Sequence, residues 1–167
     1  MHFKNINYLA GTKKILIKNL APYSNITCEF FNELSVLLLK STNAKKYTDI
    51  ISFAFWCRKK NIQNFKNDIR NTEFRVGLGL IFHICPSNIP VNFAYSFAFG
   101  LLSGNSNIVR VPSKSFPQVK IICDKINFLF KTKKFKSLNK MNLFVRYDQQ
   151  DIITSFYSSI CNARIIW

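Results

Sequence analysis

The sequence predicts an α/β fold in which a parallel sheet is preceded by N-terminal helices. Between residues 76 and 167, apolar runs typical of strands alternate with amphipathic segments typical of helices, in the order β-α-β-α-β-α-β. Proline-containing turns, PSNIP at 86–90 and PSK at 112–114, follow the first two strand-like runs. Because parallel strands end at one edge of a sheet, both turns are expected at that edge, where open α/β sheets bind ligands.

The central stretch of the chain carries the strongest local signals. Its expected elements are a strand at 76–85, the first turn, a helix at 91–102 that stops at the residues SGN, and a second strand at 107–111. This succession is typical of a right-handed βαβ unit. Gly77 and Gly79 interrupt the first run, which indicates a strand that passes close to another backbone or to a ligand.

Helical periodicity and capping residues predict the flanking elements. Ahead of the central stretch we expect one helix that Ser24 or Asn25 caps, and a second, longer helix at 48–69. Beyond it we expect a helix from 117, a basic connecting loop at 131–140, a strand at 141–147, a short helix capped by Asp148 or Asp151, and a last strand at 163–167. We therefore divide the chain into an N-terminal helical portion, residues 1–75, and the first part of an α/β domain, residues 76–167.

The chain is strongly basic as well as rich in apolar side chains. Its hydrophobic fraction of 48% excludes a disordered chain. A formal net charge of +16, from 24 Lys and Arg against 8 Asp and Glu, raises the question of nucleic acid or an acidic surface as a partner. The charge is spread along the chain, is densest at 131–140, and comes with no recognised nucleic-acid-binding module. We therefore keep a basic binding module without catalysis as the alternative function.

Metal, disulfide and membrane chemistry have little support in the sequence. The five cysteines are widely spaced, no Cys-x-x-Cys pair occurs, and there are two histidines, so neither a disulfide framework nor a zinc site is indicated. The longest apolar run, at 91–102, is shorter than the roughly 20 residues that a membrane-spanning helix needs. Because the start of the chain also lacks the pattern of a signal peptide, we expect a cytoplasmic protein with no metal and no membrane span.

Five segments together resemble one known family. Residues 82–90 read FHICPSNIP, residues 99–105 read FGLLSGN, and residues 107–114 read NIVRVPSK. The segments FAFWCRKKNI, at 53–62, and ARIIW, at 163–167, also match. A lone Pro-x-Asn-x-Pro would be a weak signal, but here the segments occur in the family's order. From about residue 20 onward the chain is similar to the LuxC-type acyl-CoA reductases, a branch of the aldehyde dehydrogenase superfamily.

This resemblance implies a Rossmann-like, dinucleotide-binding α/β domain of the aldehyde dehydrogenase type. It also implies an activity, the reduction of an acyl-CoA or another activated acyl substrate to an aldehyde through a cysteine thioester. The family places that cysteine, and a glycine-rich turn that meets the cofactor, beyond the segment RIIW. We therefore expect a truncated chain, the N-terminal, cofactor-binding part of a reductase, which is inactive alone and needs its missing C-terminal part or a second copy.

The resemblance assigns one catalytic role, to Asn88, which matches the family's oxyanion-hole asparagine. The tetrahedral intermediate of acyl transfer carries a negative oxygen that needs a fixed hydrogen-bond donor. An amide between Pro86 and Pro90 suits this role because the prolines stiffen the turn. Capping of the helix that follows is the alternative role of Asn88, and the two roles are compatible.

The resemblance also implies the cofactor-binding residues. Arg110 takes the place of a lysine that reaches the adenine ribose and its phosphates in the superfamily, and Ser113 takes the place of a glutamate that commonly binds the ribose hydroxyls. Without that carboxylate, a 2′-phosphate could pair with Arg110, Ser113 and Lys114, so we expect NADPH as the cofactor. The alternative for Arg110 and Lys114 is that both side chains lie at the solvent-exposed rim of the domain and bind no cofactor. Four further residues are expected to lie along the cofactor with their backbone: Ile84, Cys85, Pro86 and Ser87.

Three other residues could be mistaken for reactive groups. Cys85 ends a strand near a helix N-terminus, where thiol pKa values fall, but the family places its nucleophile much later in the chain. Cys161 precedes the last strand and has no histidine nearby in sequence. We expect His83, within the first strand, to be a core or cofactor-wall residue rather than a base.

Overall fold

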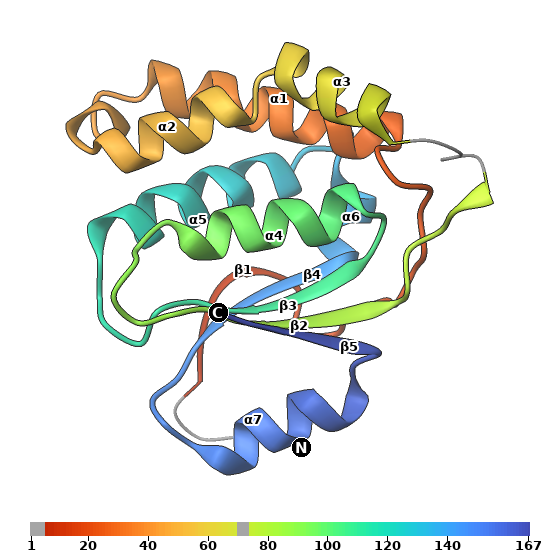
Figure 1. Cartoon of the computed structure of the whole chain (residues 1–167). Coiled ribbons are helices and arrows are strands. Elements are labelled where there is room, and N and C mark those ends of the chain that lie inside the picture. Colours follow the sequence, from red (N-terminus) through yellow and green to blue (C-terminus); the bar gives the residue numbers. More distant parts are fainter. Residues whose placement is uncertain (1–5, 70–73) are drawn as a thin grey trace.

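The computed structural model describes residues 6–69 and 74–167, and its centre is a five-stranded sheet in the order β1-β4-β3-β2-β5 (Figure 1). Four strands are parallel to one another: β2 (Leu80–Ile84), β3 (Ser106–Arg110), β4 (Asn142–Arg146) and β5 (Ala163–Ile166). The fifth strand, β1 (Asn7–Gly11), pairs with β4 in the antiparallel direction and forms one edge. The predicted α/β fold is confirmed, with a mixed, mostly parallel sheet.

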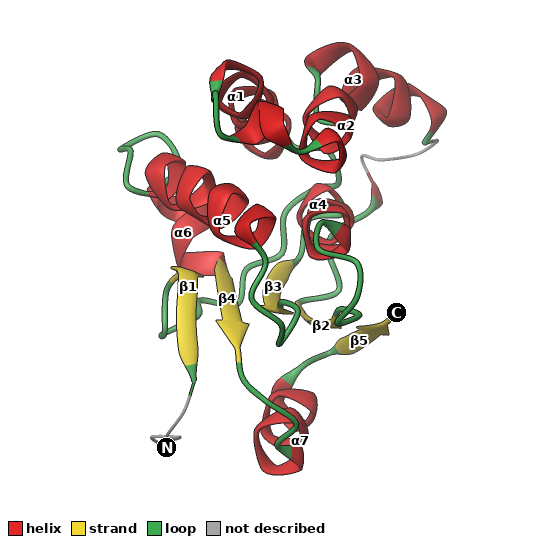
Figure 2. Cartoon of the chain, turned by 90° about the vertical axis from the view of Figure 1, so that its left-hand side faces the viewer, coloured by secondary structure: helices red, strands yellow, loops and turns green. Residues whose placement is uncertain are grey.

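Helices cover both faces of the sheet in layers (Figures 1 and 2). One face carries α4 (Asn92–Leu102), α5 (Pro117–Phe130) and the short α6 (Lys136–Met141). A second layer lies outside these helices and consists of α1 (Asn25–Lys40), a single 3-10 turn (Ala44–Lys46), α2 (Thr48–Trp56) and α3 (Lys59–Asp68). Among the described residues, α7 (Asp151–Ile160) is the helix on the opposite face.

The position of each strand explains its composition. In β2, β3 and β4, four of the five residues are buried, because helices cover both faces, and strands in such a sheet form nearly continuous apolar runs. The edge strand β5 alternates instead between half-buried and exposed residues.

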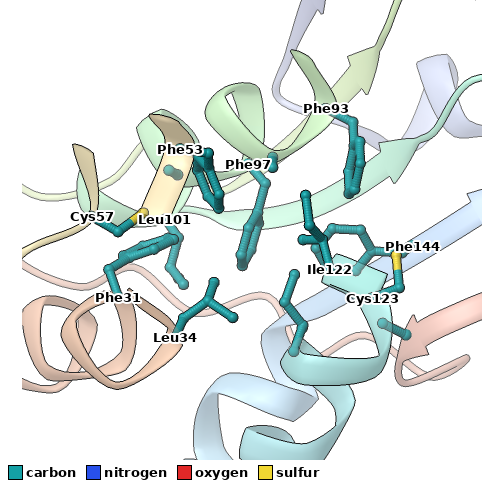
Figure 3. Packing of buried hydrophobic residues seen from close by; sticks show 14 of the residues in the cluster. Phe31, Leu34, Phe53, Cys57, Phe93, Phe97, Leu101, Ile122, Cys123 and Phe144 are labelled. Carbon is teal, nitrogen blue, oxygen red and sulfur yellow. The ribbon is translucent and has the colours of Figure 1, made fainter. Parts of the chain in front are cut away.

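The main hydrophobic core lies between the helical layers and the sheet (Figure 3). The ring of Phe97, on α4, packs edge-on against Phe144, on β4, with ring centroids 4.8 Å apart. On its other side Phe97 lies 5.6 Å from Phe31, on α1, measured between ring centroids. All three side chains are fully buried, so each contributes on the order of 3–5 kcal/mol to the stability of the fold. A smaller cluster that includes Phe82 and Tyr157 packs between the sheet and α7.

The connections between the strands create a topological switch point between β2 and β5. From β2 the chain crosses through α4 to β3, and then through α5 and α6 to β4, always in one direction along the sheet. From β4 it returns through α7, on the other face, to β5 on the far side of β2. Open α/β sheets bind ligands beyond the carboxyl ends of the strands at such a point. Figure 2 views the sheet from this end.

The first predicted strand is shorter than expected. Regular pairing begins at Leu80 rather than at residue 76, and the side chains of Val76 and Leu78 are exposed. Gly77 lies so close to the carbonyl of Gly104 that a Cβ at this position would overlap it. The expectation of a close backbone approach is therefore confirmed, and this contact takes the place of the strand pairing.

Three further local predictions were wrong or incomplete. The helix expected at 48–69 is broken after Trp56, where the side-chain oxygen of Asn32 accepts a hydrogen bond from the N–H of Lys59 (3.2 Å) and starts α3. The loop expected at 131–140 contains α6, because Phe135 and Leu138 are buried in the core. The antiparallel strand β1 was not predicted at all. The break between α2 and α3 was missed because apolar residues keep helical spacing on both sides of it. The helix α6 was missed because the many lysines at 131–140 made this segment read as a polar loop.

Candidate functional site

The carboxyl ends of the parallel strands bring the predicted site residues to one edge of the sheet. In the strand register Ile84 pairs with Arg110 on one side and with Ile166 on the other. The turns at 86–90 and 112–114 both leave from this edge, as expected (Figure 2). Residues of β2, β3 and β5 therefore meet at the switch point.

Asn88 lies in the turn between β2 and α4 and is exposed, as is the neighbouring Ser87, whereas Pro86 and Pro90 are half-buried. The helix begins later than its sequence suggested, at Asn92, and has no side-chain cap. No described residue makes a hydrogen bond with the side chain of Asn88. The helix-capping alternative is therefore wrong, and the amide is available to a ligand at the edge of the sheet.

Arg110, Ser113 and Lys114 lie where β3 ends and in the loop that follows. The guanidinium carbon of Arg110 lies 4.6 Å from the centroid of the Tyr147 ring, just after β4, a cation–π contact that holds the charge at the edge of the sheet. Lys114 is exposed, and its ammonium lies 5.4 Å from the centroid of the Phe116 ring. Ser113, which lies between these two residues in the sequence, is half-buried. Two positive charges and a hydroxyl are thus available to an anion here.

A buried chain of hydrogen bonds runs beneath α4 and links this edge to the core. The indole Nε1–H of Trp167 donates to Oγ of Ser96 (2.8 Å), and that oxygen lies 2.8 Å from Nδ1 of His83. On the other side of the ring, Nε2 of His83 lies 2.9 Å from Oδ1 of Asn107. Asn107 in turn donates through Nδ2 to Oδ1 of Asn142 (2.8 Å), which donates to a backbone carbonyl of α6 (2.7 Å).

The donors and acceptors of this network determine the protonation of His83. Both protons of Asn107 Nδ2 are used, on the carbonyl of Asn105 (2.9 Å) and on Asn142, so Asn107 Oδ1 is an acceptor. Nε2 of His83 therefore carries the proton, and Nδ1 accepts from the hydroxyl of Ser96. Burial lowers the pKa of His83 to about 4, although the hydrogen bond to Asn107 opposes this shift. The ring is neutral and fully buried, which confirms that His83 is a core residue.

Gly100 of α4 makes room for the network. A Cβ at Gly100 would overlap Oδ1 of Asn107 and press on the ring of His83. This close contact explains why a glycine occupies position 100 within the segment FGLLSGN. Sequence reasoning did not find Ser96, Asn107 or Asn142, and the available signal was the presence of polar residues within buried apolar segments.

The cysteines of the chain are poorly placed for nucleophilic chemistry at Asn88. Cys85 lies at the correct edge, but burial raises the pKa of its thiol to about 12, against the opposing effects of Ser96 and Arg110. Burial also raises the thiol pKa of Cys57 and of Cys123. The half-buried Cys28 lies on α1, and Cys161 directly follows α7 and precedes β5, so both lie away from the carboxyl edge.

The edge therefore offers an exposed amide donor, two cations and the backbone of a switch point. It can hold an anionic ligand and stabilise a developing negative oxygen. Within residues 6–69 and 74–167, no group of three or more His, Cys, Asp or Glu side chains could hold a metal ion. No helix in the same ranges is long and apolar enough to cross a membrane.

The family model described as "Acyl-CoA reductase (LuxC)" matches residues 2–133, most of the chain, including the turn that carries Asn88 and the loop that carries Lys114. No curated protein and no solved structure matches.

Proposed function

We infer the function of this chain from its family, because over residues 2–133 it belongs to the acyl-CoA reductase (LuxC) family. We propose that it is the cofactor-binding portion of an NADPH-dependent reductase that converts an acyl-CoA to an aldehyde. In the overall reaction, an enzyme thiol displaces coenzyme A from the acyl group, and hydride and a proton then release the aldehyde and regenerate the thiol. NADPH, when bound, supplies the hydride.

One observation carries this proposal: the family motif residues lie at the switch point of the sheet. Asn88 lies in the turn that follows β2, and Arg110, the last residue of β3, pairs with Ile84, the last residue of β2. This is the place at which open α/β sheets bind nucleotides. We also propose that the domain is a Rossmann-like domain of the aldehyde dehydrogenase type.

In this proposal Asn88 donates a hydrogen bond to the oxygen of the acyl group as it becomes negative. Its amide is exposed and unused by the described residues, and prolines on both sides limit the movement of the turn. The attacking thiolate must come from elsewhere. Cys85 is buried with a strongly raised thiol pKa, so we place the nucleophile outside the described residues.

The cofactor would lie across the carboxyl edge. The backbone from Ile84 to Ser87 would follow it, and Arg110, Ser113 and Lys114 would hold its adenosine end. A 2′-phosphate beside two cations and a hydroxyl would gain charge-assisted hydrogen bonds. This arrangement favours NADPH over NADH.

The proposal is tested by binding measurements on the chain itself. We expect NADPH to bind with a Kd on the order of 1 mM, about 4 kcal/mol, in saturation-transfer NMR, and NADH to bind more weakly. Arg110→Ala should weaken the binding of NADPH, whereas the charge-matched control Lys133→Ala, on the far side of the fold after α5, should not.

The alternative function is tested in the same samples. A labelled single-stranded DNA should not bind more tightly than NADPH. Absence of NADPH binding, together with DNA binding that falls steeply with salt over many phosphate contacts, would overturn the proposal in favour of a nucleic-acid-binding module.

A further inference from the structure

Trp167 is attached to the rest of the fold at two points. Its backbone N–H donates to the carbonyl of Ile84 at the end of β2 (3.2 Å). Its indole N–H donates to the hydroxyl oxygen of Ser96 on α4 (2.8 Å). Backbone and ring are therefore held by different elements, although 55% of the residue is exposed.

Ser96 is well suited to hold the indole in one orientation. It is fully buried, and its hydroxyl proton is committed to His83, so its oxygen presents a lone pair in a fixed direction. His83 is itself fixed on its other side by Asn107 (2.9 Å). An indole N–H usually finds such a partner, while the rest of the ring provides a large apolar face.

The indole lies at the switch point, on the same edge of the sheet as Asn88. Trp167 follows β5, and β5 pairs with β2 through Ile84 and Ile166. Asn88 lies in the turn that leads from β2 into α4, the helix that carries Ser96. The partly exposed Trp167 and the exposed amide thus belong to two neighbouring segments at one edge of the sheet.

We propose that Ser96 is a positioning residue that holds the Trp167 indole at the carboxyl edge of the sheet, where the exposed part of the ring forms one wall of the NADPH site and stacks against the nicotinamide ring. This inference rests on the proposed function. A flat aromatic face suits a flat heteroaromatic ring, and the geometry of an offset stack depends on the orientation of the indole. Loss of the hydrogen bond to Ser96 would let the ring rotate, and the wall would no longer be preformed.

A double-mutant cycle on the intact chain tests the inference. NADPH affinity is measured by NMR titration, and the two tryptophan indole N–H signals, of Trp56 and Trp167, are followed in the same spectra. Ser96→Ala should shift the Trp167 indole signal and speed its exchange with solvent, leave the Trp56 signal in place, and weaken NADPH binding roughly fivefold. Ser103→Ala, at the exposed residue that follows α4, is the control and should change neither quantity.

The second half of the cycle separates positioning from general damage. Trp167→Phe keeps an aromatic ring but has no N–H, so in its background Ser96→Ala should no longer affect NADPH affinity. Equal weakening by Ser96→Ala in both backgrounds, or no weakening while the unmodified chain binds NADPH, would overturn the inference and leave the proposed function standing. Failure of the unmodified chain to bind NADPH would overturn both.

Discussion

Acidification should destabilise the protein through one buried group, His83. The ring is fully buried between Ser96 and Asn107, and its Nε2 proton and Nδ1 lone pair are both in use. A second proton on Nδ1 would face the hydroxyl proton of Ser96. Protonation therefore requires Ser96 to rotate and disturbs the hydrogen bond that holds Trp167.

The size of the effect follows from the two pKa values. An unfolded histidine has an ordinary pKa of 6.5, and the pKa of His83 in the folded protein is lowered to about 4. Between these values the unfolded chain binds a proton that the folded chain does not, so stability falls as the pH is lowered. Linkage gives a loss of about 2 kcal/mol between pH 7 and pH 5, and of about 3 kcal/mol by pH 4.

The assay is urea unfolding of the unmodified chain and of His83→Gln across this pH range. All other titrating groups are common to both proteins, so the difference in their pH dependence isolates His83. The difference in unfolding free energy should shrink by about 2 kcal/mol between pH 7 and pH 5, because glutamine does not titrate. Parallel curves for the two proteins, or an NMR titration in which the His83 ring protonates near pH 6.5, would refute this account of the network.

Further predictions concern packing, cofactor choice and catalysis. Gly100→Ala should destabilise the chain by about 1–3 kcal/mol in urea unfolding, because the added methyl group presses on Asn107 and His83; an unchanged midpoint would contradict the contact. Lys114→Glu should weaken NADPH binding by about 1–3 kcal/mol and leave NADH nearly unaffected; equal losses would make Lys114 structural. The chain alone should form no thioester when incubated with labelled acyl-CoA, as judged by mass spectrometry, and stoichiometric acylation of Cys85 would show that the nucleophile was misplaced. In a catalytically competent fusion with the remaining part of a family member, Asn88→Ala should lower kcat by about 100- to 1000-fold, whereas an effect on KM alone would argue against an oxyanion role.

The central βαβ unit could be predicted because its signals are local. Strand composition, the proline turn and the glycine stop all depend on neighbours in sequence, and β2, α4 and β3 occur in the expected order, although β2 is shorter than the predicted strand. The strand β1 could not be predicted, since its existence depends on pairing with β4, more than a hundred residues later. The break between α2 and α3 was missed for a similar reason, because its hydrogen bond comes from Asn32 on another helix.

At the site, too, residues within local motifs could be predicted from the sequence, whereas contacts between distant residues could not. Asn88, Arg110 and Lys114 were predicted as site residues because the family motifs contain them, and the sheet brings their segments to one edge. The link from Trp167 to Ser96 spans 71 residues. No periodicity or motif marks such a contact, so it required the folded chain.

We propose that the carboxyl edge at β2 and β5 binds NADPH, and residue-resolved NMR can locate the bound cofactor on the fold. Amide and indole signals of the labelled chain are followed during titration with NADPH. If NADPH binds at this edge, the largest shifts occur at residues 84–88, at 110–114 and at the Trp167 indole, and the Trp56 indole does not move. Shifts confined to the basic segment 131–140, or spread evenly over the exposed lysines, would contradict it.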